Sequence, residues 1–166
     1  ESVGSKGTTP KLSAYLEHHL SNKQTIVVDF NSSFYFGRSY STYLEQKAAG
    51  DQQREHLTSI DTEIKDRNQA YAIEANYIKQ WRNSRLTAGA SYTANRNRSV
   101  YENLGGQIFH QRQDKAYFFT EYFQRVNKVT LTAGIGAQYT DYLFKETNQG
   151  NHSWNLRPQA TISYGL

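Results

Sequence analysis

The 166-residue sequence predicts an all-β protein, an antiparallel up-and-down meander of about seven long strands. Apolar and polar residues alternate over long stretches, which is the period of a strand with one apolar and one polar face. Short polar turns alternate with long polar connections, as in a meander of hairpins. The chain is 37% hydrophobic and 14% aromatic and has two prolines, which is typical of neither a disordered nor a collagen-like chain. No apolar stretch approaches the roughly 20 residues of a transmembrane helix.

Four stretches show the alternation clearly. In the first, a helix would bring Asp29 next to Phe30 on nearly the same face, so a strand is favoured. The clear stretches are 26–44, 86–95, 129–140 and 154–164, and weaker ones cover Leu12–Leu20, Ala70–Trp81 and Ala116–Arg125. In Ala116–Arg125 both faces carry aromatic residues, and the pattern leaves its inner face open.

The connections predict how the strands are joined. Residues 1–10 are small and polar and are expected to form a polar leader, which leaves 11–166 as the strand-bearing segment. Short turns are predicted at 21–24, 82–85 and 125–128, and long connections near 46–67, 95–113 and 145–153. The chain begins with Glu1 rather than Met, and we expect that it was processed or excised from a longer protein.

The polar side of the clear strands indicates which way the apolar side points. It consists mostly of Thr, Ser, Asn, Gln and Gly, whereas the charged residues gather in turns and connections. Strands of an outer-membrane β-barrel have this pattern, because their apolar side meets lipid and their polar side meets a wet interior. A soluble antiparallel barrel that binds a ligand inside remains an alternative, since its strands alternate with the same period.

Two sets of residues follow from the barrel interpretation. Aromatic rings near the turns and about ten residues further along the strands predict two girdles at the membrane interfaces: Phe34, Phe36, Trp81, Tyr92, Phe123, Tyr139 and Trp154. Polar residues of the opposite parity are predicted to face the lumen: Glu17, Asp29, Asn31, Glu74, Asn76, Gln138 and Arg157.

Two segments carry a family resemblance. The stretch 129–142, which follows the turn 123–128, resembles a barrel hairpin of TonB-dependent outer-membrane receptors, and 154–164 resembles the next strand, with Pro158 shortly after its start. The sequence pattern of these segments is similar to that of Bacteroidetes receptors of the nutrient-uptake type. The resemblance implies a bacterial outer-membrane location, import of a nutrient or siderophore-like ligand, a plug within the barrel and a TonB-type energy-coupling protein as partner.

The chain also departs from that family. Seven strands cannot form a transporter barrel of about 22 strands, and no plug segment is visible. We therefore expect a wall segment of a larger barrel, whose open edges pair with the remainder of the barrel or with a second copy in a homo-oligomer. Another outer-membrane barrel, with an adhesion or structural role, is the alternative.

The sequence shows little sign of a metal site, a dinucleotide site or a catalytic site. There is no cysteine, and His18 and His19 are neighbours that point to opposite faces of a strand, so no metal site is predicted. Gly134-Ile-Gly136 lacks the third glycine and the helix of a dinucleotide fingerprint. We predict no enzymatic activity, no cofactor and no nucleic-acid partner. Basic residues at the strand ends are expected to contact the lipid bilayer or lipopolysaccharide phosphates.

Overall fold

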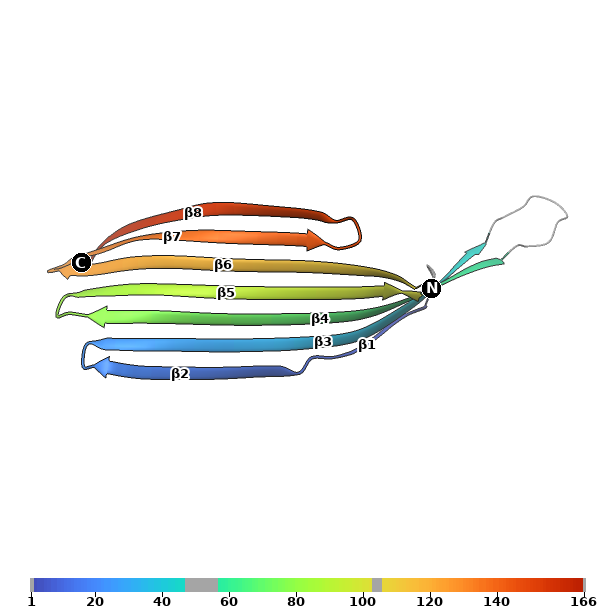
Figure 1. Ribbon diagram of the computed structural model, residues 1–166, viewed down its shortest axis with the longest axis horizontal. Coiled ribbons are helices and arrows are strands. Elements are labelled where there is room, and N and C mark those ends of the chain that lie inside the picture. The colour runs from blue at the N-terminus through green and yellow to red at the C-terminus, as the bar shows by residue number, and fades with distance from the viewer. Residues whose placement is uncertain (1, 47–56, 103–105, 166) are drawn as a thin grey trace.

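A computed structural model describes residues 2–46, 57–102 and 106–165. Within them, eight strands form one antiparallel sheet (Figure 1). The strands are β1 (Ser2–Thr8), β2 (Lys11–Ser21), β3 (Gln24–Gln46), β4 (Leu57–Gln80), β5 (Ser84–Tyr101), β6 (Gln107–Val126), β7 (Val129–Phe144) and β8 (Gln149–Tyr164). The predicted all-β antiparallel meander is confirmed, with eight strands instead of about seven. The described part contains no helix long and apolar enough to cross a membrane.

Tight turns join β2 to β3, β4 to β5 and β6 to β7 at one end of the sheet, on the left in Figure 1. All three were predicted as short turns. In the last of them Asn127 has a φ of 53°, a left-handed conformation that asparagine tolerates better than most residues. We call this side of the sheet the tight-turn end.

At the opposite end the strands are longer than the sequence predicts. β4 begins at Leu57, and the pairing of β5 with β6 continues to Tyr101 and Gln107, so the predicted connections 46–67 and 95–113 are much shorter. The reason is that ladder hydrogen bonds join backbone groups, so polar residues such as Arg96 and Arg98 continue a strand as well as apolar ones do. Of the predicted connection 46–67, residues 47–56 lie outside the described part.

The predicted polar leader contains a strand. β1 pairs with the distal half of β3, from Ser2 opposite Thr42 to Thr8 opposite Phe36, while β2 pairs with the proximal half. The two strands thus lie end to end along one edge of β3. The small residues of β1 suit this place, because Gly4 lies against the ring of Tyr40.

The sheet is a single layer with little core. Among the described residues, Ala94 is the one buried hydrophobic residue, at 6% exposure, and no large side chain is fully buried. The sheet does not close on itself within these residues: β8 pairs with β7 alone, and β2 pairs with β3 alone. An isolated single layer leaves both of its faces and both of its edges without a partner.

Candidate functional site

The strand pairings assign every strand residue to one of two faces, because directly opposed residues point to the same side. Asp29 lies opposite Glu74, and Gly136 lies opposite Arg157. All seven residues predicted to face a lumen share one side, which we call the polar face: Glu17, Asp29, Asn31, Glu74, Asn76, Gln138 and Arg157. That this face lines a lumen stays a prediction.

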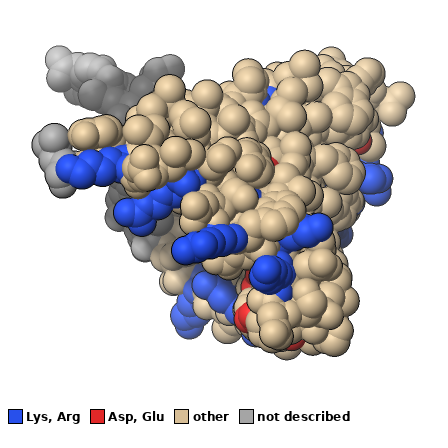
Figure 2. Space-filling model, turned by 90° about the vertical axis from the view of Figure 1, so that its left-hand side faces the viewer, with Lys and Arg blue, Asp and Glu red and all other residues tan. Residues whose placement is uncertain are grey.

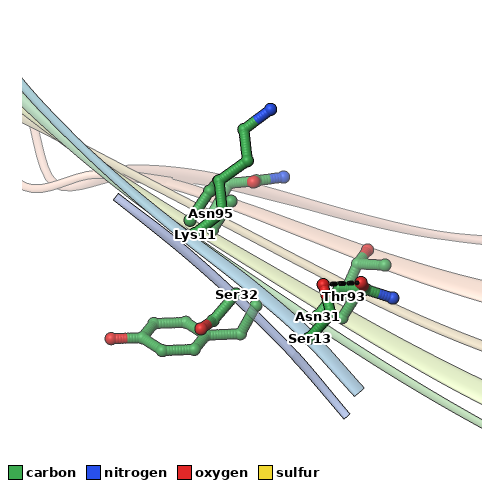
Figure 3. A pocket seen from close by; sticks show the side chains of 10 residues that line it. Lys11, Ser13, Asn31, Ser32, Thr93 and Asn95 are labelled. Atoms are coloured by element: carbon green, nitrogen blue, oxygen red, sulfur yellow. Dashed lines mark hydrogen bonds between the residues drawn. The ribbon is translucent and has the colours of Figure 1, made fainter. Parts of the chain in front are cut away.

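A groove of about 400 Å³ runs along the polar face where β2, β3, β4 and β5 lie side by side. In Figure 3, Ser13, Asn31 and Thr93 point into it, and Ser32 points to the opposite side of the sheet. The hydroxyl of Ser13 donates a 2.8 Å hydrogen bond to Oδ1 of Asn31. Hydroxyl and amide groups arranged in this way can donate hydrogen bonds to a polar ligand and accept hydrogen bonds from it.

A hollow of about 300 Å³, lined in part by Asp29, Glu74 and Ser91, carries negative charge. Asp29 and Glu74 are directly opposed carboxylates, an arrangement that is unfavourable in a sheet unless water or a donor offsets it. Nδ2 of Asn76 supplies one such donor, at 2.6 Å from Oε1 of Glu74. The hollow suits cationic or hydroxyl-rich groups.

Glycines on the polar face let aromatic rings lie flat across the strands. The ring of Tyr117 from β6 covers Gly136 of β7, and the guanidinium of Arg157 from β8 lies 5.7 Å from the centroid of the same ring. The ring of Phe119 likewise covers Gly89. Rings that cover glycines in this way stabilise neighbouring strands against each other.

The opposite side, which we call the apolar face, holds most of the apolar strand residues. On β7 Leu131, Ala133 and Ile135 are exposed, whereas their polar-face neighbours Gly134 and Gly136 are less so. Ile135 is 53% and Leu156 of β8 is 74% exposed. On β6, whose inner face the sequence left open, Phe118 and Tyr122 lie on the apolar face and Tyr117 on the polar face. The sheet thus exposes its apolar side chains, the reverse of a soluble core.

Most of the predicted girdle residues lie on the apolar face. Tyr139 and Trp154 face each other there across β7 and β8, with ring centroids 5.0 Å apart. Phe34, Phe36 and Tyr92 occupy the same side of their strands, and Trp81 extends it at the tight-turn end, where Lys79 lies over its ring at 5.1 Å.

Phe123 differs from its prediction. It lies opposite Arg85 and Thr132, which places it on the polar face, and the Arg85 guanidinium is 5.5 Å from its ring centroid. Its neighbour Tyr122, at 42% exposure, holds the corresponding position on the apolar face. Adjacent strand residues point to opposite sides, and an aromatic pair leaves the choice open in the sequence.

The two neighbouring histidines lie apart on the sheet. His18 is paired with Ile26 and His19 with Thr25, so they belong to opposite faces. His19 accepts or donates at Thr25 Oγ1, 3.0 Å away, and its Nε2 lies 3.3 Å from a Glu17 oxygen. The described residues contain no group of three or more His, Cys, Asp or Glu side chains that could hold a metal ion.

One charged network was not anticipated. Asp114, 6% exposed on the apolar face, pairs with Arg96 and Arg112 and accepts a 2.8 Å hydrogen bond from the Tyr92 hydroxyl. The sequence does contain a signal for this network. Arg96 follows Ala94 by two residues and so lies on the same face of β5, where the side chains change from apolar to charged while the strand continues. The polar character of that stretch favoured a loop instead.

Comparison with known proteins gives distant structural likeness. No protein-family model and no curated protein matches the chain. Among solved structures, it is similar to the outer membrane protease OmpT from Escherichia coli, at 8% identity and a TM-score of 0.41, over 95% of this chain and 63% of the protease. It is also similar to a major outer membrane protein from Thermus thermophilus, at 8% identity and a TM-score of 0.27, over 96% of this chain and 98% of that one. The chain thus spans 63% of the length of the protease.

Proposed function

We propose that this chain is a wall segment of a bacterial outer-membrane β-barrel of the TonB-dependent receptor type, which imports a nutrient or siderophore-like ligand. The main support for a membrane location is the exposed apolar face. Monomeric soluble proteins rarely expose a contiguous apolar patch of more than a few hundred Å². Here the apolar residues extend from Leu16 on β2 to Leu156 on β8, across seven neighbouring strands.

The height of the apolar band supports a bilayer. On β7 it runs from Val129 beside the tight turn to Tyr139, ten residues further along the strand. At about 3.3 Å per residue and a strand tilt of about 40°, ten residues rise roughly 25 Å. This matches the apolar band of outer-membrane barrels, which is about 25 Å tall.

The open edges support membership in a larger assembly. Lipid offers no hydrogen-bonding partner, so the edges of β2 and β8 must be covered by further strands. The remainder of a receptor barrel provides them, with the plug against the polar face and an energy-coupling protein acting on the whole receptor. The same open edges favour, as the second candidate, an adhesion or structural barrel completed by copies of this chain.

Cysteine labelling tests the membrane part, since the chain has no native cysteine. In phosphatidylcholine vesicles, a hydrophilic maleimide should label Thr132→Cys on the polar face and leave Leu131→Cys unlabelled, while both react in denaturant. Circular dichroism should sharpen in micelles, with aggregation in plain buffer by light scattering. Equal labelling in vesicles, or a compact monomer in plain buffer, would favour the soluble ligand-binding barrel.

Uptake assays test the transport part. Cells that carry the full-length protein should accumulate a radiolabelled ferric siderophore or a labelled maltodextrin only when their TonB-type protein is intact. Surface location without uptake that depends on this protein would favour the adhesion or structural barrel.

A further inference from the structure

A basic pocket of about 330 Å³ lies on the apolar side of the sheet, away from the tight-turn end. Its cationic lining residues are Arg67 of β4, Arg96 and Arg98 of β5, Arg112 of β6 and Lys145 after β7. Arg67 lies directly opposite Arg98, and Arg96 directly opposite Arg112. Like charges in opposed positions destabilise a sheet, so this pocket needs negative charge.

Asp114 supplies part of that charge. Its carboxylate lies 2.8 Å from Nη2 of Arg96 and contacts Nε of Arg112, and the Tyr92 hydroxyl fixes its orientation. The carboxylate is nearly covered by its neighbours, so the two guanidinium groups are held in place. Arg96 and Arg112 are therefore held in a fixed arrangement, unlike freely moving surface side chains.

The remaining cations lack a carboxylate. In the described part of the chain, Arg67, Arg98 and Lys145 form no ion pair, although the Arg67 guanidinium lies 5.1 Å from the ring centroid of Phe36. His110, which also lines the pocket, is hydrogen-bonded to Glu146 at 2.8 Å. Positive charge therefore remains unbalanced beside guanidinium groups whose planar forks fit phosphate oxygens.

We propose that the basic pocket binds the phosphoryl group of an anionic membrane lipid. The guanidinium groups favour a phosphoryl group as the ligand, and the position of the pocket at the end of the apolar band favours a lipid as its source. On β5 Arg96 and Arg98 continue the row of Tyr92 and Ala94 on the same face, so they lie where the apolar band ends and headgroups begin. The inference rests on the proposed function, because it takes the apolar face to meet lipid.

The tight-turn end provides a matched control. Lys and Arg side chains are also frequent there (Figure 2): Arg82 and Arg85 stand at the turn between β4 and β5, and Arg125 stands at the end of β6. Arg82 and Arg125 line a hollow at that end, and Arg125 donates to the carbonyl oxygen of Asn127. Removing two charges at that end changes the net charge as much as removing two from the basic pocket.

The experiment uses the chain in uncharged maltoside micelles, titrated with a short-chain phosphatidic acid and followed by phosphorus NMR and calorimetry. The double variant Arg67→Gln/Arg98→Gln should bind about tenfold to a hundredfold more weakly, since two charge-assisted contacts are lost. Arg82→Gln/Arg125→Gln should bind as the parent chain does. Diacylglycerol of the same chain length should not bind at the site.

Three binding results would count against the proposal. An unchanged affinity of the Arg67→Gln/Arg98→Gln variant, or an equal loss in the control variant, would show that net charge alone attracts the lipid. Pyrophosphate binding as tightly as phosphatidic acid, with the same loss in the variant, would identify a soluble phosphate ligand. The denaturation midpoint of the variant should stay close to that of the parent chain, because removal of the opposed charges of Arg67 and Arg98 offsets loss of the Arg67–Phe36 contact. A large fall in the midpoint together with weaker binding would trace the loss of affinity to unfolding and contradict the proposal. Failure of the proposed function would appear separately, in the labelling of β7, which contributes no residue to the pocket.

Discussion

A single arginine on β7 tests the membrane interpretation. Ile135 lies six residues above Val129 and four below Tyr139, which places it near the middle of the apolar band. It is 53% exposed and lies opposite Pro158 of β8. In a bilayer, Ile135→Arg should lower the free energy of unfolding by about 2–4 kcal/mol, the cost of arginine on the lipid side of a barrel at the midplane. This equals a fall in the folding equilibrium constant of about 30- to 900-fold.

Urea unfolding in phosphatidylcholine vesicles, followed by tryptophan fluorescence, measures the change. Thr132→Arg on the same strand is the control: it lies on the polar face, and its cost should stay within about 0.5 kcal/mol, as for an ordinary surface position. If Ile135→Arg costs no more than Thr132→Arg, the apolar face does not meet lipid.

Two further predictions concern packing and pH. Gly136→Ala should lower the unfolding free energy by about 1–3 kcal/mol in denaturant melts, because a Cβ would lie 2.6 Å from Cε2 of the Tyr117 ring, whereas Gly165→Ala, with its nearest atom at 3.8 Å, should be neutral. Desolvation raises the pKa of Glu146, but hydrogen bonds from its own backbone and from His110 outweigh this and hold the pKa below its ordinary value of 4.5. The anchor to the His110 amide, 2.7 Å from Oε1, is therefore complete above pH 4.5 and lost as the pH falls through the lowered value. Below pH 4.5 the protection factor of that amide, which is its intrinsic exchange rate divided by the measured rate, should fall. Unchanged protection in Glu146→Gln would contradict the role of the carboxylate charge.

Period-two alternation predicted β2, β3, β5, β7 and β8 and the face of most of their residues, because side-chain direction is fixed by backbone geometry. It left the face of β6 open, where aromatic residues stand on both sides, and it put Phe123 on the wrong face. Strand ends were harder to predict. The stretch around Arg96 is polar on both sides, and only its pairing with β4 and β6 shows that it is a strand. β1 was missed for a related reason. Its small polar residues have little intrinsic preference for a strand, and they form one by pairing with β3, where Gly4 lies opposite Tyr40. The basic pocket joins three strands and a turn, so no single stretch of sequence reveals it.

The order of the strands has a consequence for how the sheet assembles. From β2 to β8 each strand pairs with the next one in sequence, so after one tight turn forms, each later step closes one further connection. Closing short loops costs little entropy, and sequential pairing of this kind is kinetically favourable. β1 is different, because it reaches β3 only past β2 and finds its partners far along the chain, Ser5 opposite Ser39 for example. We expect strand pairing to begin at the tight turns and to spread along the strands from there, with β1 pairing late.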